Sequence, residues 1–466
     1  MLPHHRIAIA STAVAALLLT GCGTQRSSDS SAVTTSGGAS VASKPPSSAA
    51  PASSTALGGP PGGSGGSSAS YPATGSVVRT SGTAVVSGRT ITSSTDDRSG
   101  VLASGSAKLT LQAVRVITSG NSKSSDQSSF YGLNAGVLAK PSAQVSILGG
   151  SVSTSGAGAN GVFAYGTGSS VLVKHATIAT TGNYAHGIMA SGGGRLTAAN
   201  TTIGTAGASS AAIATDRGGG TITVSGGTMT TTGYRSPGIY STGTITVTGA
   251  NINATGSEAA VVEGKNSILV RNSKLSGAKN RGVMLYQSMS GDAGVGTASY
   301  QMIGGSLYAA QGPAFYITNT TARITLRSGA LVRAASGVLL RADNAGTGSG
   351  NTGAGVATLI ASGEELTGDI VTAGTGSASI SLTNATTLAG SITRAALMLD
   401  RTSTWTVTSN SKLTAFTDQA AISGNQILNV VGNGHTVTYD ASLAANKALG
   451  GKTYQLTGGG TLAPAQ

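Results

Sequence analysis

One spacing of apolar residues recurs ten times between Ala84 and Leu331. In each copy an apolar residue is followed by another two positions later and by a third seven positions after the first. The first members are Ala84, Leu109, Val145, Val171, Leu196, Ile222, Ile245, Ile268, Tyr300 and Ile324, and the last of the third members is Leu331. A period of about 25 residues predicts a solenoid, in which each repeat packs on its neighbours.

Each repeat contains the signals of three short strands. Gly or Ala followed by an apolar residue, as in Gly161-Val162, marks the first strand. Alternating apolar residues, as in Ile222-Thr-Val224, mark the second strand. A turn rich in Gly and Asn follows, because these residues tolerate left-handed backbone angles, and then comes the third strand. Residues that favour helices are scarce throughout.

Three strands in so short a repeat leave each strand to pair with its equivalent one repeat later. We therefore predict an all-β chain that folds as a single-stranded parallel β-helix, or β-solenoid. The prediction is about 13 coils of three short strands, spaced by the usual distance between strands. Right-handed winding is the default that crossover chirality gives.

Composition divides the chain into four parts. Residues 76–345 hold the regular coils, and residues 346–466 are expected to form less regular coils and a cap. Residues 22–75 are rich in Ser, Gly, Pro and Ala and poor in charges and aromatic rings, so a disordered linker is expected there. Residues 1–21 carry an apolar stretch from Ile7 to Leu19 behind a basic start. This stretch is too short to cross a bilayer and is typical of a signal peptide.

Directly after that stretch stands Leu19-Thr20-Gly21-Cys22, which resembles the lipobox of bacterial lipoproteins. The resemblance implies cleavage before Cys22, attachment of a lipid to the Cys22 thiol, and export. Because Gly23 follows, it also implies an outer-membrane or cell-surface location rather than retention at the inner membrane. Cys22 is the single Cys of the chain, so no disulfide forms within it. The alternative is a secretory signal followed by an incidental Cys.

The coil pattern resembles the pectin-lyase-like superfamily, which includes polysaccharide lyases, glycoside hydrolases and autotransporter adhesin passengers. The segment from Leu399 to Thr408, with Leu413 after it, resembles the strand motif near the C-terminal end of those passengers. Autotransporters continue into a membrane barrel, whereas this chain stops at Gln466, so we expect the lipid to retain it.

No catalytic or metal-binding constellation is expected, and no cofactor. Asp96-Asp97 is interpreted as a solvated turn, and His175 and His186 as turn residues. The best enzymatic candidate is Asp216 with Glu263, two coils apart and near the upper end of the carboxyl separation of inverting glycosidases, about 6.5–9.5 Å. Counted from the Gly/Ala markers, however, their side chains should face opposite ways.

One column of residues, two positions after each Gly/Ala marker, is largely apolar and predicted to face outward. It consists of Leu102, Leu138, Phe163, Met189, Ala214, Tyr240, Val262, Met284, Tyr316 and Leu339. An exposed apolar strip marks a binding surface, and Phe163, Tyr240 and Tyr316 are its predicted binding residues. The alternative is the opposite register or a covering loop.

A net charge of +13 would suit an acidic surface polymer or glycan as partner, and the alternative is a solvated face on a low-charge rod. The membrane would be reached through the lipid. No specific nucleic-acid partner is expected, since no known module is present. The recurrent Thr154, Thr180, Thr205 and Thr231 should point inward, which argues against an ice-binding face. We therefore expect a non-enzymatic, adhesin-like surface lipoprotein. A polysaccharide lyase or glycoside hydrolase on the same scaffold is the alternative.

Overall fold

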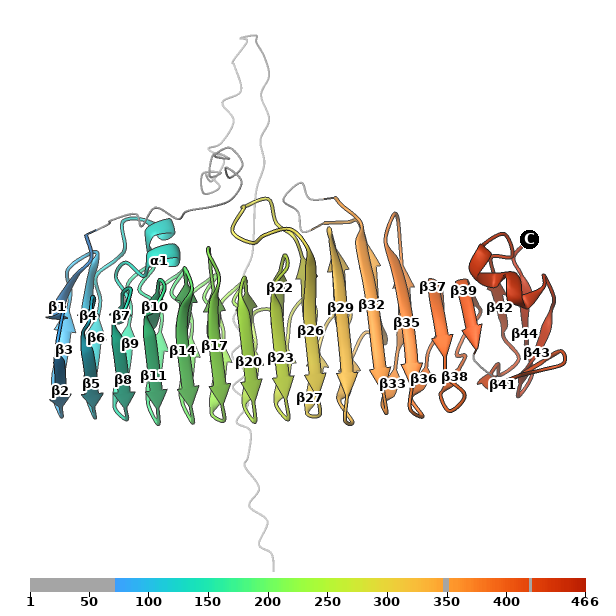
Figure 1. Ribbon diagram of the computed structural model, residues 1–466, viewed down its shortest axis with the longest axis horizontal. Coiled ribbons are helices and arrows are strands. Elements are labelled where there is room, and N and C mark those ends of the chain that lie inside the picture. The colour runs from blue at the N-terminus through green and yellow to red at the C-terminus, as the bar shows by residue number, and fades with distance from the viewer. Residues whose placement is uncertain (1–71, 347–351, 419–420) are drawn as a thin grey trace, which may run out of the picture. The chain divides into compact units, whose positions relative to one another are not determined.

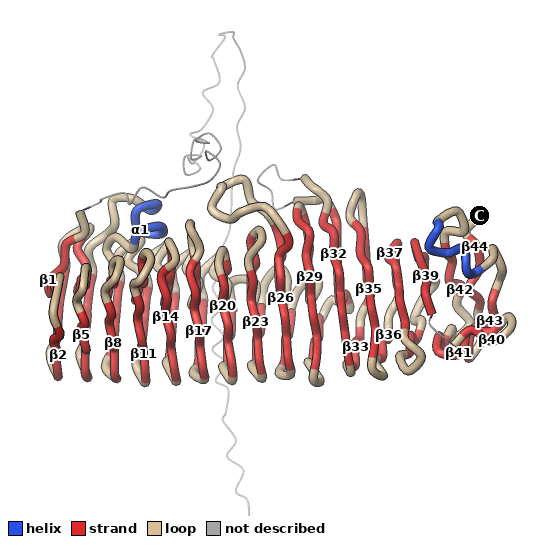
Figure 2. Tube along the Cα trace, viewed as in Figure 1, coloured by secondary structure: helices blue, strands red, loops and turns tan. Residues whose placement is uncertain are grey.

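The computed structural model describes residues 72–346, 352–418 and 421–466. This part of the chain is a parallel β-solenoid of about 15 turns, which confirms the predicted fold (Figure 1). Three strands per coil also agree with the prediction, and Figure 2 shows strands joined by short turns in almost every coil. The predicted signal peptide, the predicted lipid attachment at Cys22 and the predicted linker up to residue 71 lie outside the described residues.

The first strands of successive coils pair in parallel with one another. They are β1 (Thr74–Arg79), β4 (Arg98–Ala103), β7 (Val137–Ala139), β10 (Val162–Tyr165), β13 (Ile188–Ser191), β16 (Ile213–Thr215), β19 (Ile239–Ser241), β22 (Ala260–Glu263), β25 (Val283–Tyr286), β28 (Phe315–Thr318), β31 (Val338–Asp343) and β34 (Asp369–Thr372). The outer face of these strands is covered by other residues in some coils and forms a hollow in others.

The second strands form the longest ladder of the solenoid. They are β2 (Thr83–Ser87), β5 (Lys108–Gln112), β8 (Gln144–Leu148), β11 (Ser170–Lys174), β14 (Gly194–Ala199), β17 (Gly220–Ser225), β20 (Thr244–Thr248), β23 (Ser267–Arg271), β26 (Thr297–Ile303), β29 (Thr320–Arg327), β32 (Gly355–Ser362) and β35 (Ser377–Thr383).

The third strands form a separate ten-stranded parallel sheet up to β30. They are β3 (Thr90–Ser93), β6 (Arg115–Thr118), β9 (Ser151–Thr154), β12 (Thr177–Thr180), β15 (Thr202–Thr205), β18 (Thr228–Thr231), β21 (Asn251–Ala254), β24 (Lys274–Gly277), β27 (Ser306–Ala309) and β30 (Leu331–Ala334), with β33 (Glu365–Thr367), β36 (Thr387–Ala389) and β38 (Thr404–Thr406) in later coils.

The C-terminal coils are shorter and end in antiparallel pairs, β40 with β41 and β43 with β44. These elements are β37 (Ile392–Leu399), β39 (Ser411–Asp418), β40 (Ile422–Ser423), β41 (Gln426–Val431), β42 (Thr436–Tyr439), the 3-10 helix η1 (Ala444–Leu449), β43 (Tyr454–Thr457) and β44 (Thr461–Pro464). Trp405 is buried there, and its indole N–H donates to the Gly390 carbonyl at 2.9 Å.

The core runs along the inside of the coils, as the alternation predicted. Ile245 and Val247 are fully buried and pair with Ile222 and Val224 of the preceding coil. The Thr column also points inward, as expected. Each of its hydroxyls donates to a carbonyl five residues later, for example Thr180 to Ala185 at 2.7 Å. These hydroxyls are therefore used within the fold and form no outer face.

Stacking explains the Gly that ends the third strand. A Cβ on Gly182 would overlap the carbonyl of Gly156 one coil earlier, and a Cβ on Gly207 would overlap that of Gly182. Because these turns lie directly on one another, only Gly fits without moving the backbone.

Three details of the predicted register are wrong. In the coil after Gly238 the equivalent residue is Ala259 rather than Ala260, because the turn before β22 is shorter than the turn before β19. Val261, and not Val262, therefore lies beside Tyr240. In the tenth copy of the apolar spacing, the third buried residue is Val332, which lies beside Leu307. Leu331, the residue predicted for this position, is 49% exposed. In the following coil Tyr316 pairs with Arg341, so Leu339 leaves the outward column too.

Candidate functional site

The N-terminal residues of the outward column are covered by an inserted segment that contains a helix. The helix α1 (Ser125–Tyr131) is inserted between β6 and β7, with Ser124 as its N-cap and Gly132 in the left-handed conformation after it. Gly132 lies against Leu138 and Phe163, and these two side chains form one buried cluster with Met189.

Phe163 is therefore 0% exposed, which corrects the expectation that its ring lies on an open strip. The sequence spacing indicates an insertion at this point of the chain. The third-strand positions Val116 and Val152 are 36 residues apart, whereas Ile178 and Ile203 are 25 apart. The extra residues supply the helix.

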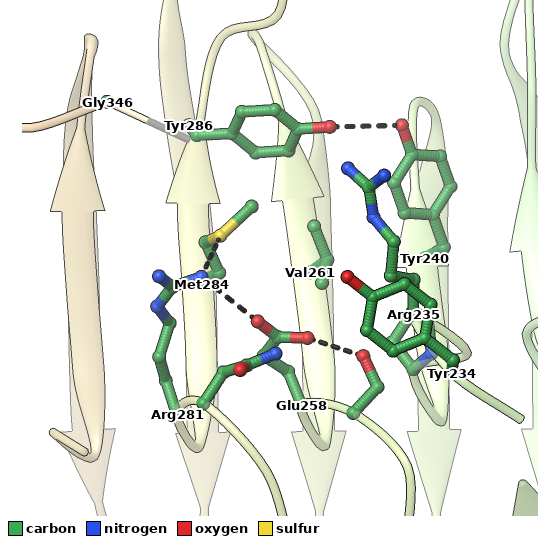
Figure 3. A pocket seen from close by; sticks show the side chains of 12 residues that line it. Tyr234, Arg235, Tyr240, Glu258, Val261, Arg281, Met284, Tyr286 and Gly346 are labelled. Carbon is green, nitrogen blue, oxygen red and sulfur yellow. Dashed lines mark hydrogen bonds and ion pairs between the residues drawn. The ribbon is translucent and has the colours of Figure 1, made fainter. Parts of the chain in front are cut away.

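Further along the rod the same face is hollow. Two adjoining hollows of about 550 and 240 Å³ share Arg235, Pro237 and Tyr240, and we call them together the groove. The remaining lining residues are His186, Ser209, Ala211, Tyr234, Ser257, Glu258, Val261, Asn280, Arg281, Met284, Tyr286 and Gly346. The groove thus crosses successive coils along the rod, and Figure 3 shows its larger part.

The floor of the groove comes from the outward column of β19, β22 and β25. Tyr240, Val261 and Met284 lie side by side there, since their strands are in register. One wall is the turn that precedes each first strand, which supplies Tyr234, Arg235 and Asn280. Because these positions repeat every coil, a chain lying in the groove would meet equivalent backbone at each strand spacing, about 4.8 Å.

One ion pair lines the groove. Arg281 donates to the Glu258 carboxylate at 3.0 Å and lies over the Tyr316 ring, 4.4 Å from its centroid. The Tyr316 hydroxyl donates to Asp343 at 2.8 Å, and the residue is only 5% exposed. Tyr316 is therefore covered by Arg281, contrary to the expected exposure, while Tyr240 is half-buried and reaches the groove.

Asp216 and Glu263 face the same side of the sheet, which corrects the expectation that they point apart. Counted from Ala259, the true marker of its coil, Glu263 is four residues along, as Asp216 is from Ala212. The error arose from the shorter turn before β22. Burial and the charge of Asp292 raise the pKa of Asp216, and the charge of Glu263 adds to this effect.

Glu263 is 1% exposed and fully satisfied by hydroxyl groups. Tyr240, Tyr286, Ser288 and Ser290 all donate to its carboxylate. The two serines belong to the loop of residues 287–296 between β25 and β26, which we call the β25–β26 loop. This loop closes over Glu263 and leaves no free carboxylate oxygen pointing into the groove.

The same loop places a third carboxylate near the pair. Asp292 accepts from Arg217 at 2.7 Å, and the Arg217 guanidinium also lies 3.9 Å from the centroid of the Phe130 ring in α1. Burial, and then the charge of Asp292, raises the pKa of Asp216 to about 7. Asp216 is therefore largely protonated below neutral pH.

Arg235 stands at the point where the two hollows meet. Its backbone is in the left-handed region with φ of 55°, as is that of Tyr184 two coils earlier with φ of 56°. For a residue with a side chain this conformation costs about 1–2 kcal/mol. Tyr234 beside it is 74% exposed. Local structure does not require an arginine or a tyrosine at these positions.

The remaining sequence candidates occupy turns. His175 is exposed with φ of 53°. His186 accepts from the Ala211 N–H through Nδ1 at 2.9 Å, and burial lowers its pKa to about 4. Asp96 and Asp97 accept from the backbone of Asn121 and Lys123 in the next coil, both at 2.9 Å. Over the described ranges, His, Cys, Asp and Glu side chains nowhere gather in a group able to hold a metal ion.

No family model matches the chain, and no curated protein matches it. Among the described residues, no helix is long and apolar enough to span a membrane.

Proposed function

We propose that this protein is a lipid-anchored surface protein, adhesin-like and non-enzymatic, that binds a glycan chain along the groove. The observation that carries the proposal is a polar groove that crosses successive coils and is lined by Tyr234, Tyr240 and Tyr286. Tyrosine rings present an apolar face for sugar rings and a hydroxyl for hydrogen bonds. An elongated, polar hollow suits an extended polymer better than a compact apolar molecule.

The anchor is proposed on the sequence motif at Cys22 and its preceding apolar stretch. A lipid on Cys22, followed by about 50 residues of linker, would hold the rod at the cell envelope with its groove free to meet a polymer. Both the anchor and the linker lie outside the described residues, so this part of the proposal rests on the sequence motif alone.

A glycan-array screen of the purified protein tests the binding proposal, with Tyr234→Ala as the groove variant. Tyr308→Ala is the matched control, because Tyr308 is 48% exposed on β27, in a different sheet and away from the groove. Aromatic hot spots are often worth about 2 kcal/mol, or roughly 30-fold in affinity. We expect such a loss for Tyr234→Ala and less than a twofold change for the control. Equal losses of affinity in the two variants, or no glycan bound by the parent, would refute the proposal that the groove binds a glycan.

A polysaccharide-active enzyme is the second candidate, because Asp216 and Glu263 share one face and Asp216 has its pKa raised to about 7. Inverting glycosidases use a pair of carboxyl groups, one of which is a general acid with a raised pKa. In an enzyme, Asp216→Asn with Glu263→Gln would abolish cleavage, measured as new reducing ends, and preserve binding. We expect no cleavage by the parent, because the β25–β26 loop covers Glu263. If the parent cleaves a polysaccharide and the double variant does not, the protein is an enzyme and the non-enzymatic proposal is wrong.

A further inference from the structure

Three arginines in or beside the first strands form ion pairs. Arg217 pairs with Asp292, Arg281 with Glu258 and Arg341 with Asp343, at 2.7, 3.0 and 2.7 Å. Arg235, in contrast, makes no hydrogen bond or ion pair with any residue in the described ranges. Its side chain reaches over the groove floor between Tyr240 and Tyr286 (Figure 3).

Nearby carboxylates do not compete for this guanidinium. Glu258 already accepts from Arg281 and from the Ser257 hydroxyl. Glu263 is surrounded by four hydroxyl donors under the β25–β26 loop. The positive charge of Arg235 is thus left available at the junction of the two hollows, where a ligand crossing the groove must pass it.

The fold gives no reason for an arginine there. In the stacked turns the equivalent positions hold Gly158, Tyr184 and Ser209, all in the left-handed conformation. An arginine in this conformation carries backbone strain that a glycine would avoid. Among these four stacked positions only Arg235 carries a charge, and that charge faces a hollow.

From these contacts we infer that Arg235 is the anion-recognition residue of the groove and that the bound glycan carries acidic substituents. A guanidinium presents a planar fork of N–H donors that matches carboxylate, sulfate and phosphate groups. The inference rests on the proposed function, since it assigns the chemistry of the chain that the groove holds. The overall charge of +13 would draw such a chain to the rod from a distance.

Matched polymers that differ in charge alone test this inference. The probes are dextran sulfate against dextran, and alginate against carboxyl-reduced alginate, with affinity measured by biolayer interferometry on the full chain. The variants are Arg235→Gln, Tyr234→Ala and, as a control with the same loss of charge, Arg195→Gln. Arg195 is exposed on the second-strand sheet, away from the groove.

We expect the parent to bind the acidic member of at least one pair tenfold or more tighter than the neutral member. Arg235→Gln should remove that preference and change binding of the neutral member less than twofold. Tyr234→Ala should weaken both members, and Arg195→Gln neither. Melting temperature identifies a variant that has lost its fold, and Arg235→Gly, which suits the turn, then replaces Arg235→Gln.

Two results would overturn the inference and leave the groove itself in place: equal binding of neutral and acidic members, or equal losses from Arg235→Gln and Arg195→Gln. The second result would show attraction by overall charge. If the parent binds none of these probes and no glycan on the array, both the proposed function and the inference are wrong.

Discussion

Ile245→Asp places a carboxyl group in the middle of the core column. Ile245 is fully buried on β20 and lies between Ile222 and Ile268 of the neighbouring coils. Losing the buried isoleucine costs about 2–3 kcal/mol. Keeping the new carboxyl protonated at pH 7 requires its pKa to rise by about three units, at roughly 1.4 kcal/mol each. The total of about 6 kcal/mol is comparable with the stability of many whole domains.

Thr246→Asp is the matched control, since Thr246 is the next residue and faces outward beside Thr223 and Leu269. Surface changes of this kind usually stay within about 0.5 kcal/mol. Thermal and urea unfolding, followed by circular dichroism, should separate the two variants at pH 7. A buried acid has a raised folded pKa, so its penalty is present above the unfolded pKa near 4 and shrinks as pH falls toward that value. Equal damage from both variants would show that the register is wrong.

Three further outcomes are expected. Cys22→Ser should leave the protein soluble or uncleaved and abolish palmitate labelling, and unchanged detergent partitioning would contradict the anchor. Phe163→Ser should lower the stability by about 3–4 kcal/mol, because the ring is buried under α1, and a melting temperature equal to that of the parent would show that α1 does not cover it. Asp216→Asn should make the protein more stable than the parent at pH 8 but not at pH 4. The raised pKa of Asp216, about 7, means that the parent loses stability as pH rises from about 4 through 7, and parallel melting curves across this range would refute the assignment.

Much of the fold could be predicted because parallel stacking repeats the same local requirement in every coil. Ile245, Val247 and the inward Thr column were correctly placed, since a residue two positions from a buried one faces the same side. Register errors arose where one turn changed length. The turn before β22, like those before β25 and β28, is shorter than the turns of the preceding coils. The marker of this coil is therefore Ala259, which moved Val262 out of the outward column and reversed the predicted direction of Glu263.

The groove could not be predicted in the same way. Phe163 and Tyr240 occupy equivalent positions of their coils, yet one is buried and the other reaches a hollow. The difference comes from insertions between strands, the one holding α1 and the β25–β26 loop, which cover some coils and leave others open. Periodicity signals that an insertion is present but not the direction in which it folds.

By itself, the sequence determined the solenoid and its inward residues, because both depend on spacing along the chain. Only the tertiary structure decided which outward side chains are covered, which carboxyls are paired, and that Arg235, between two hollows, forms no ion pair with any of the described residues. These depend on contacts between coils and on loops folding back over several of them, whose geometry no local pattern encodes.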